Sequence, residues 1–111
     1  MNPSPYIYPG LVSLPYSLEG ILETVCRATG TDRAEVCSKS RKTETVAARQ
    51  LFCFFAKKHT KHTFGQIGKM LGSYDHSTVI HAIKKVNDMI YTKDPLITGM
   101  FDKIKKELTN D

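Results

Sequence analysis

Residues 63–86, TFGQIGKMLGSYDHSTVIHAIKKV, decide the fold. Thr63 and Gln66 have the spacing of a capping box, in which the two side chains satisfy free amides at the start of a helix. Gly72 predicts the end of that helix after about eight residues, because glycine adopts the left-handed conformation most easily. Only two residues then precede Asp75, a typical N-cap residue. The pattern predicts a helix, a tight turn and a second helix.

The second helix of this pair has one apolar and one polar face. Its expected buried stripe is Val79, Ala82, Ile83, Val86 and Ile90. Ser77, His81 and Lys84 follow one another at positions i, i+4 and i+7 on the outward face. In a helix-turn-helix the second helix enters the major groove of DNA, where such side chains reach base edges. Taken singly, each residue also fits a purely structural role, since Ser77 can satisfy free amides of the first turn and His81 can pack against a neighbouring helix.

Helical spacing also accounts for most of the remaining chain. Ser17 predicts a helix start and Gly30 its end, and Asp32 with Glu35 predicts a second capping box before a short helix. A long central helix is expected from about Thr43 to Lys58. Its expected buried stripe is Val46, Ala47, Leu51, Phe54 and Phe55, and Asp94-Pro95 opens a final helix. No segment alternates at period two for long enough to predict a strand, so the expected fold class is all-α.

Length and composition favour one domain behind a tail. Residues 1–16 contain four of the five prolines and are expected to form a Pro-rich N-terminal tail, whereas residues 17–111 are expected to form the helix-turn-helix domain. No stretch approaches the roughly 20 apolar residues of a membrane helix, and no secretory leader is recognisable. We therefore expect a cytoplasmic, nucleoid-associated protein that does not bind membranes.

The positive charge is concentrated in the centre of the chain. Residues 33–62 carry eight Lys and Arg against two Asp and Glu, whereas residues 1–32 carry one against three. A concentrated basic region indicates a polyanionic partner, although a solvated face has the same composition. Residues 38–42, SKSRK, interrupt the apolar pattern and predict a basic loop, or else a plain exposed linker. The basic residues expected at phosphates or in an adjacent minor groove are Lys39, Arg41, Lys42, Arg49 and Lys57.

Neither the cysteines nor the histidines predict a metal centre. The three cysteines form no C-x-x-C pair and are expected to be reduced and inert. His59 and His62 lie three residues apart, and two further histidines lie on the second helix of the pair, but no acidic or cysteine partner completes a zinc set. We expect no metal, no other cofactor and no enzymatic activity.

Three stretches resemble one family. They are Val46–Gln50 (VAARQ), Phe64–Gly72 (FGQIGKMLG) and Asp75–Ala82 (DHSTVIHA). In order and spacing, about residues 17–108 resemble the C-terminal DNA-binding domain, domain IV, of the bacterial chromosomal replication initiator DnaA. The resemblance implies a small domain of about six helices with a TrpR-like helix-turn-helix. It also implies binding of a short double-stranded origin sequence, the DnaA box.

The resemblance further implies roles for individual residues. Asp75, His76, Ser77 and Thr78 would contact bases and phosphates in the major groove, and Arg41 would reach the minor groove. Arg49, Gln50 and Lys57 would hold the DNA backbone. The candidate DNA-binding set is therefore Lys39, Arg41, Lys42, Arg49, Gln50, Lys57, Asp75, His76, Ser77, Thr78, His81 and Lys84.

The chain departs from the family pattern in three respects. Tyr74 stands where the family usually has arginine, and the basic loop is thinner because Ser40, Thr43 and Glu44 occupy positions that are often basic. These changes predict an altered preference for the DNA sequence. The 111 residues also contain no G-x-x-x-x-G-K-S/T phosphate loop, so we expect a free-standing domain that binds no nucleotide and cannot alone drive ATP-dependent melting of an origin.

Two functional hypotheses follow. In the first, the protein binds duplex DNA in a sequence-specific manner at DnaA-box-like sites and regulates replication initiation or transcription. In the second, it is a protein-interaction module of the replication machinery that keeps the fold but has lost specific DNA binding, as Tyr74 and the thin loop suggest. A replication or transcription protein is thus the other partner considered.

Overall fold

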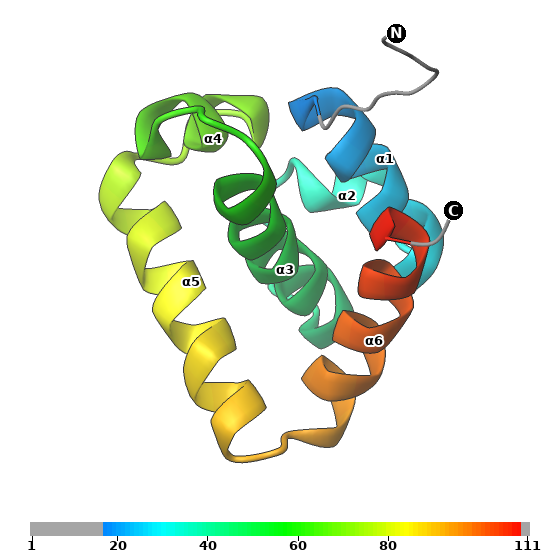
Figure 1. Ribbon diagram of the computed structural model, residues 1–111. Coiled ribbons are helices and arrows are strands. Elements are labelled where there is room, and N and C mark those ends of the chain that lie inside the picture. Colours follow the sequence, from blue (N-terminus) through cyan, green and yellow to red (C-terminus); the bar gives the residue numbers. More distant parts are fainter. Residues whose placement is uncertain (1–16, 110–111) are drawn as a thin grey trace, which may run out of the picture.

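The computed structural model describes residues 17–109, which form six α-helices and, within that range, no strand (Figure 1). The helices are α1 (Leu18–Thr29), α2 (Arg33–Val36), α3 (Thr43–His59), α4 (Phe64–Met70), α5 (His76–Tyr91) and α6 (Pro95–Thr109). The all-α class and the six helices expected from the sequence are confirmed. The predicted Pro-rich tail, residues 1–16, lies outside the described residues.

Helix α3 lies at the centre of the domain and contacts every other helix. Helices α1 and α6 pack together on one side of it, and α4 and α5 on the other, while α5 and α6 converge towards the turn that joins them (Figure 1). Because α3 is covered on more than one side, it is buried on more than one face. The arrangement leaves the start of α5 at the outside of the domain.

The burial of α3 is wider than the single stripe that the sequence predicted. Ala48, Phe52 and Cys53 are at most 1% exposed, although none belongs to that stripe. Val46 and Phe54, which do belong to it, are only half-buried. A one-sided stripe is the rule for a helix at the surface, and it fails for a helix surrounded by others.

Most predicted helix ends are confirmed. The Ser17 hydroxyl accepts a hydrogen bond from the Gly20 amide, and Gly30 ends α1 with a φ of 68°. Thr63 and Gln66 form the expected reciprocal capping box at α4.

The second predicted capping box is wrong. The Asp32 side chain makes no capping hydrogen bond. The Glu35 carboxylate instead accepts a hydrogen bond from the buried Thr45 hydroxyl of α3, at 3.3 Å. Helix α2 has a single turn, and its acidic residue serves the contact with α3 rather than the helix's own start.

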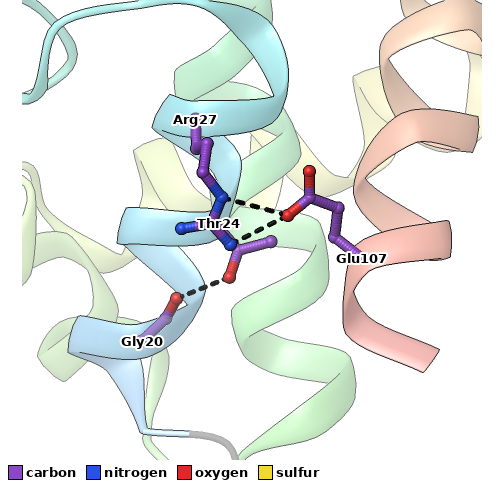
Figure 2. A network of polar contacts seen from close by, with 4 residues as sticks. All are labelled: Gly20, Thr24, Arg27 and Glu107. Atoms are coloured by element: carbon purple, nitrogen blue, oxygen red, sulfur yellow. Dashed lines mark hydrogen bonds and ion pairs between the residues drawn. The ribbon is translucent and has the colours of Figure 1, made fainter. Parts of the chain in front are cut away.

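An ion pair joins α1 to α6 at the surface. Figure 2 shows Arg27 and Glu107 pointing towards each other, with Arg27 Nε and Nη2 donating to Glu107 Oε1 at 3.1 and 2.8 Å. Within α1 the Thr24 hydroxyl donates to the Gly20 carbonyl. Both members of the ion pair are well exposed, so the pair contributes at most about 1 kcal/mol. The buried side chains of Ile21, Val25 and Ile104 hold these helices more firmly.

Candidate nucleic-acid interface

The turn between α4 and α5 is unusually tight. Gly72 and Ser73 both have positive φ values, 97° and 100°, of which the second is uncommon for a residue other than glycine. The Tyr74 amide then donates back to the Gly68 carbonyl at 3.2 Å. A Cβ atom on Gly68 would overlap the Tyr74 carbonyl group. Only glycine therefore allows α5 to leave α4 at this angle.

The first turn of α5 is organised by Asp75. Its Oδ1 accepts hydrogen bonds from the Thr78 amide at 2.9 Å and from the Thr78 hydroxyl at 3.0 Å. These bonds from Thr78, the amide first, hold the pKa of Asp75 below its ordinary value. The carboxylate is thus ionised at neutral pH, and the Thr78 oxygen, whose proton is already used, is left as an acceptor.

The outward face of α5 carries the polar residues that the sequence placed there. His76, Ser77, Thr78, His81 and Lys84 are all exposed. Val79, Ala82 and Val86 are buried, as predicted, while Ile83 and Ile90 are only half-buried. The separation of the two faces is confirmed, and the roles of the exposed residues in DNA binding stay predictions.

A groove runs between α3 and α5 beside this face. One part of it has a volume of about 300 Å³, and its walls include the apolar side chains of Val46, Leu71 and Val79. A second hollow of about 300 Å³ shares Val46, Gln50 and Lys85 with the first and extends to Arg41. The groove thus brings together five residues of the candidate set: Arg41, Arg49, Gln50, Thr78 and His81.

Lys85 lines both hollows and was missing from the candidate set, whereas Lys84 lines neither. The sequence spacing could have predicted Lys85. It lies four residues after His81 and seven after Thr78, which places all three on one face of the helix. Lys84 is exposed one position further round. The lysine on the groove side of α5 is therefore Lys85, whereas the predicted stripe contained Lys84.

The basic loop is braced from below by Arg49. The guanidinium donates from Nε to the Val36 carbonyl at 2.9 Å, and from Nη2 to the carbonyls of Ser38 and Ser40 at 2.9 and 3.1 Å. Among the described residues, Nη1 has no hydrogen-bond partner. Arg49 therefore shapes the loop first, and only Nη1 remains for a phosphate.

The three other basic residues of the loop region are exposed, and the Lys39 ammonium also lies over the Tyr74 ring. Lys39, Arg41 and Lys42 are exposed, and Lys42 is the residue that precedes α3. None of the three forms an ion pair within residues 17–109. Their charge is therefore available to a polyanion.

Lys57 lies apart from the groove. Its Nζ donates to the His62 carbonyl at 3.3 Å and sits 4.5 Å from the centroid of the Phe64 ring, beside the start of α4. It lines a separate hollow with Phe54 and Lys58. The structure therefore places Lys57 at the first helix of the helix-turn-helix, away from Arg41.

The three cysteines and His59 lie in partly or fully buried surroundings. No three His, Cys, Asp or Glu side chains in residues 17–109 gather as a metal site would require. The three cysteines in this range are free, and burial raises the pKa of the Cys53 thiol to about 12. The His59 ring stacks on the Phe55 ring with their centroids 6.0 Å apart, and burial lowers the pKa of His59.

Within residues 17–109, no helix has the length and apolar character needed to cross a membrane.

Residues 18–86 match the family model for the bacterial dnaA protein helix-turn-helix, which is more than half of the chain. Relatives named chromosomal replication initiator protein DnaA include those of Flavobacterium psychrophilum, 44% identical over 72 residues, and Thermodesulfovibrio yellowstonii, 37% identical over 95 residues. These alignments cover 65% and 86% of this chain, but only 15% and 22% of the relatives. The relative from Bacteroides thetaiotaomicron is 38% identical over 74 residues, which are 67% of this chain and 16% of that protein. The chain therefore spans about a fifth or less of the length of these relatives.

Proposed function

Because the chain belongs to the bacterial DnaA helix-turn-helix family, a DNA-binding and non-catalytic fold, we propose that it recognises double-stranded DNA at DnaA-box-like sites. The observation that carries the proposal is the exposed first turn of α5, which stands beside a basic loop on the same side of α3. The first turn of α5 fits the major groove of DNA, and the basic loop fits the phosphate backbone or the minor groove.

The start of α5 enters the major groove in this proposal. An α-helix with side chains is about 10–12 Å wide, and the major groove of B-DNA is about 12 Å wide. His76 and Ser77 offer donors and acceptors to base edges, while Thr78 and Asp75 offer acceptors to groups such as the amino group of cytosine. His81 and Lys85 would then meet the same groove further along the helix.

The basic loop contacts the DNA on the other side of the groove between α3 and α5. Arg41 is exposed there, and arginine is well suited to a narrow minor groove. Lys39, Lys42 and Lys57 would contact phosphates, which position the protein without reading the sequence. Gln50 and the free Nη1 of Arg49 would add backbone contacts from α3.

The biological consequence follows from competition for sites. A protein that occupies DnaA-box-like sequences excludes other proteins that use them, and so regulates replication initiation or transcription. Its place in the cell would be the nucleoid. The similar proteins are named replication initiators, and this chain covers 15–22% of their length. The proposal therefore assigns DNA recognition to these residues and leaves ATP-dependent steps to other parts of such proteins.

A second function is favoured by one observation at the other end of α5. Tyr91 is 87% exposed and Leu96, in the first turn of α6, is 37% exposed. Exposed aromatic residues are typical of sites where proteins bind one another. We therefore keep a partner protein of the replication or transcription machinery as the alternative occupant of this domain.

Fluorescence anisotropy with a DnaA-box duplex and a scrambled duplex of the same length, at two salt concentrations, tests the proposal. We expect tighter binding to the box and a loss of affinity at higher salt, because each phosphate contact releases counterions. His76→Ala should remove the preference, whereas Lys103→Ala, an exposed change on α6, should not. Equal binding of the two duplexes would contradict specific recognition. Absence of binding to either would favour the partner-protein function.

A further inference from the structure

Tyr74 connects the turn of the helix-turn-helix to the basic loop. Its hydroxyl donates a 2.7 Å hydrogen bond to the carbonyl of Ser38, a residue 36 positions earlier in the chain. The Nζ atom of Lys39 lies 3.6 Å from the centroid of the Tyr74 ring, and the guanidinium carbon of Arg49 lies 5.3 Å from it. The basic loop and Arg49 therefore enclose the ring.

The Ser38 carbonyl is the point where these contacts meet. It accepts from the Tyr74 hydroxyl and also from Arg49 Nη2 at 2.9 Å. The other end of the connection is equally fixed, since the Tyr74 backbone is held against Gly68. A half-buried side chain with both ends fixed leaves the loop little freedom to move relative to α5.

We propose that Tyr74 is a positioning residue that holds the basic loop in register with α5, so that both meet DNA as one prearranged surface. This inference rests on the proposed function. The Tyr74 hydroxyl uses its proton on Ser38 and does not read bases. Its effect on DNA passes through Lys39 and Arg41, the loop residues whose positions it fixes.

The physical gain is a smaller entropic cost of binding. A loop that is ordered before it meets the DNA loses less conformational freedom in the complex. The Lys39 ammonium over the ring adds a cation–π attraction, which is modest at an exposed site. An arginine at position 74 would instead place a new positive charge at the turn.

The first experiment measures amide hydrogen exchange in the free protein by NMR. Tyr74→Phe removes only the hydroxyl, and we expect the Ser38 and Ser40 amides to exchange about fivefold faster, as loss of one neutral hydrogen bond implies. Amides of α1 and α6 should not change. The matched control is Tyr91→Phe, which removes the same atom from a ring that is 87% exposed. Unchanged exchange at Ser38 and Ser40 would overturn the inference.

The second experiment asks whether Tyr74 acts through the loop. Binding of the DnaA-box duplex is measured for Tyr74→Phe, Arg41→Ala and the double variant. We expect Tyr74→Phe to weaken binding about fivefold in the wild-type background and clearly less once Arg41 is alanine, because only Lys39 then still transmits its effect. Equal weakening in both backgrounds would overturn the inference, because Tyr74 would then act independently of Arg41.

The two experiments separate this inference from the proposed function. If the wild-type protein shows no preference for the box, the proposed function fails, whereas the exchange measurement still decides whether Tyr74 holds the loop. If the box is preferred and Tyr74→Phe changes neither exchange nor affinity, the proposed function stands and the inference fails. Melting curves of each variant show whether the domain itself is intact.

Discussion

The Tyr74 amide donates a hydrogen bond to the Gly68 carbonyl at 3.2 Å, so the turn after α4 folds back onto the helix that it leaves. The two backbones are so close that a Cβ atom on Gly68 would lie 2.9 Å from the Tyr74 carbonyl carbon and nearer still to its oxygen. The same Cβ would approach Val79 of α5 at 3.4 Å. This contact sets the angle between the two helices of the helix-turn-helix.

Gly68→Ala should therefore destabilise the domain. The added methyl group meets backbone atoms, which cannot move aside as a flexible side chain would, and we expect a loss of about 3 kcal/mol in the free energy of unfolding. Urea denaturation measures it. The matched control is Gly99→Ala in α6, where the new Cβ has nothing within 4 Å and should stabilise the protein by roughly 0.5–1 kcal/mol. Similar effects of the two changes would show that the contact is not restrictive.

Arg49→Lys tests the brace beneath the basic loop. Lysine keeps the charge but cannot reach the carbonyls of Val36, Ser38 and Ser40 with the fixed fork of a guanidinium. We expect the free energy of unfolding to fall by about 1–3 kcal/mol, because hydrogen bonds from a charged donor are lost. Lys42→Arg, an exposed change in the same region, serves as the control. Full stability of Arg49→Lys would mean that the brace is unimportant.

Asp75→Ala should lower the melting temperature, and by more at neutral pH than in acid. Hydrogen bonds from Thr78 hold the pKa of Asp75 below its ordinary value of 3.8 in the folded protein. A carboxylate with a lowered pKa stabilises the fold above pH 3.8, and that stability is lost as the pH falls through the folded pKa. Melting curves across this range should show the gap between wild type and variant narrowing in acid.

Asp32→Ala is the control for this pH dependence. Asp32 also precedes a helix but makes no side-chain capping bond, so its removal should change the melting temperature little at any pH. A gap for Asp75→Ala that stays constant down to the acid range would contradict the capping role of the ionised carboxylate.

The sequence predicted some of these features and missed others. The caps at Ser17, Thr63 and Asp75 are local, since each depends on an interaction with a residue three positions further on, and all were foreseen. The contact between Tyr74 and Ser38 joins residues 36 apart, and nothing in the spacing pointed to it. At position 74 the sequence indicated only the loss of an arginine.

At the candidate site, too, the sequence predicted some features and missed others. Periodicity placed the polar residues of α5 on its exposed face, but it could not say which residues of α3 lie opposite. The groove formed with α3 therefore selects Lys85 rather than Lys84. Periodicity also could not show that the Arg49 fork turns towards the loop, because that direction depends on where α2 ends.

The cysteines should differ in reactivity with a thiol reagent in the native protein. Burial raises the pKa of the Cys53 thiol to about 12, and the side chain is 1% exposed, so it lacks both a thiolate and access. We expect Cys53 to react only after unfolding in urea, whereas Cys26 and Cys37, which are half-buried, should react slowly in the folded protein. Mass spectrometry after brief labelling identifies the modified residues. Native labelling of Cys53 would show that α3 opens locally.

Arg41→Ala and Lys57→Ala should weaken DNA binding in different ways. Arg41 belongs to the basic loop and lines the groove, whereas Lys57 lies beside the start of α4. We expect Arg41→Ala to relax the preference for the sequence at one edge of the site, because an arginine in the minor groove reads its width. Lys57→Ala should weaken all sequences about equally and reduce the log–log salt slope by about 0.9. Anisotropy with a panel of single-base-pair variants of the box, at several salt concentrations, separates the two effects. Equal changes in sequence preference for both variants would refute this division of roles.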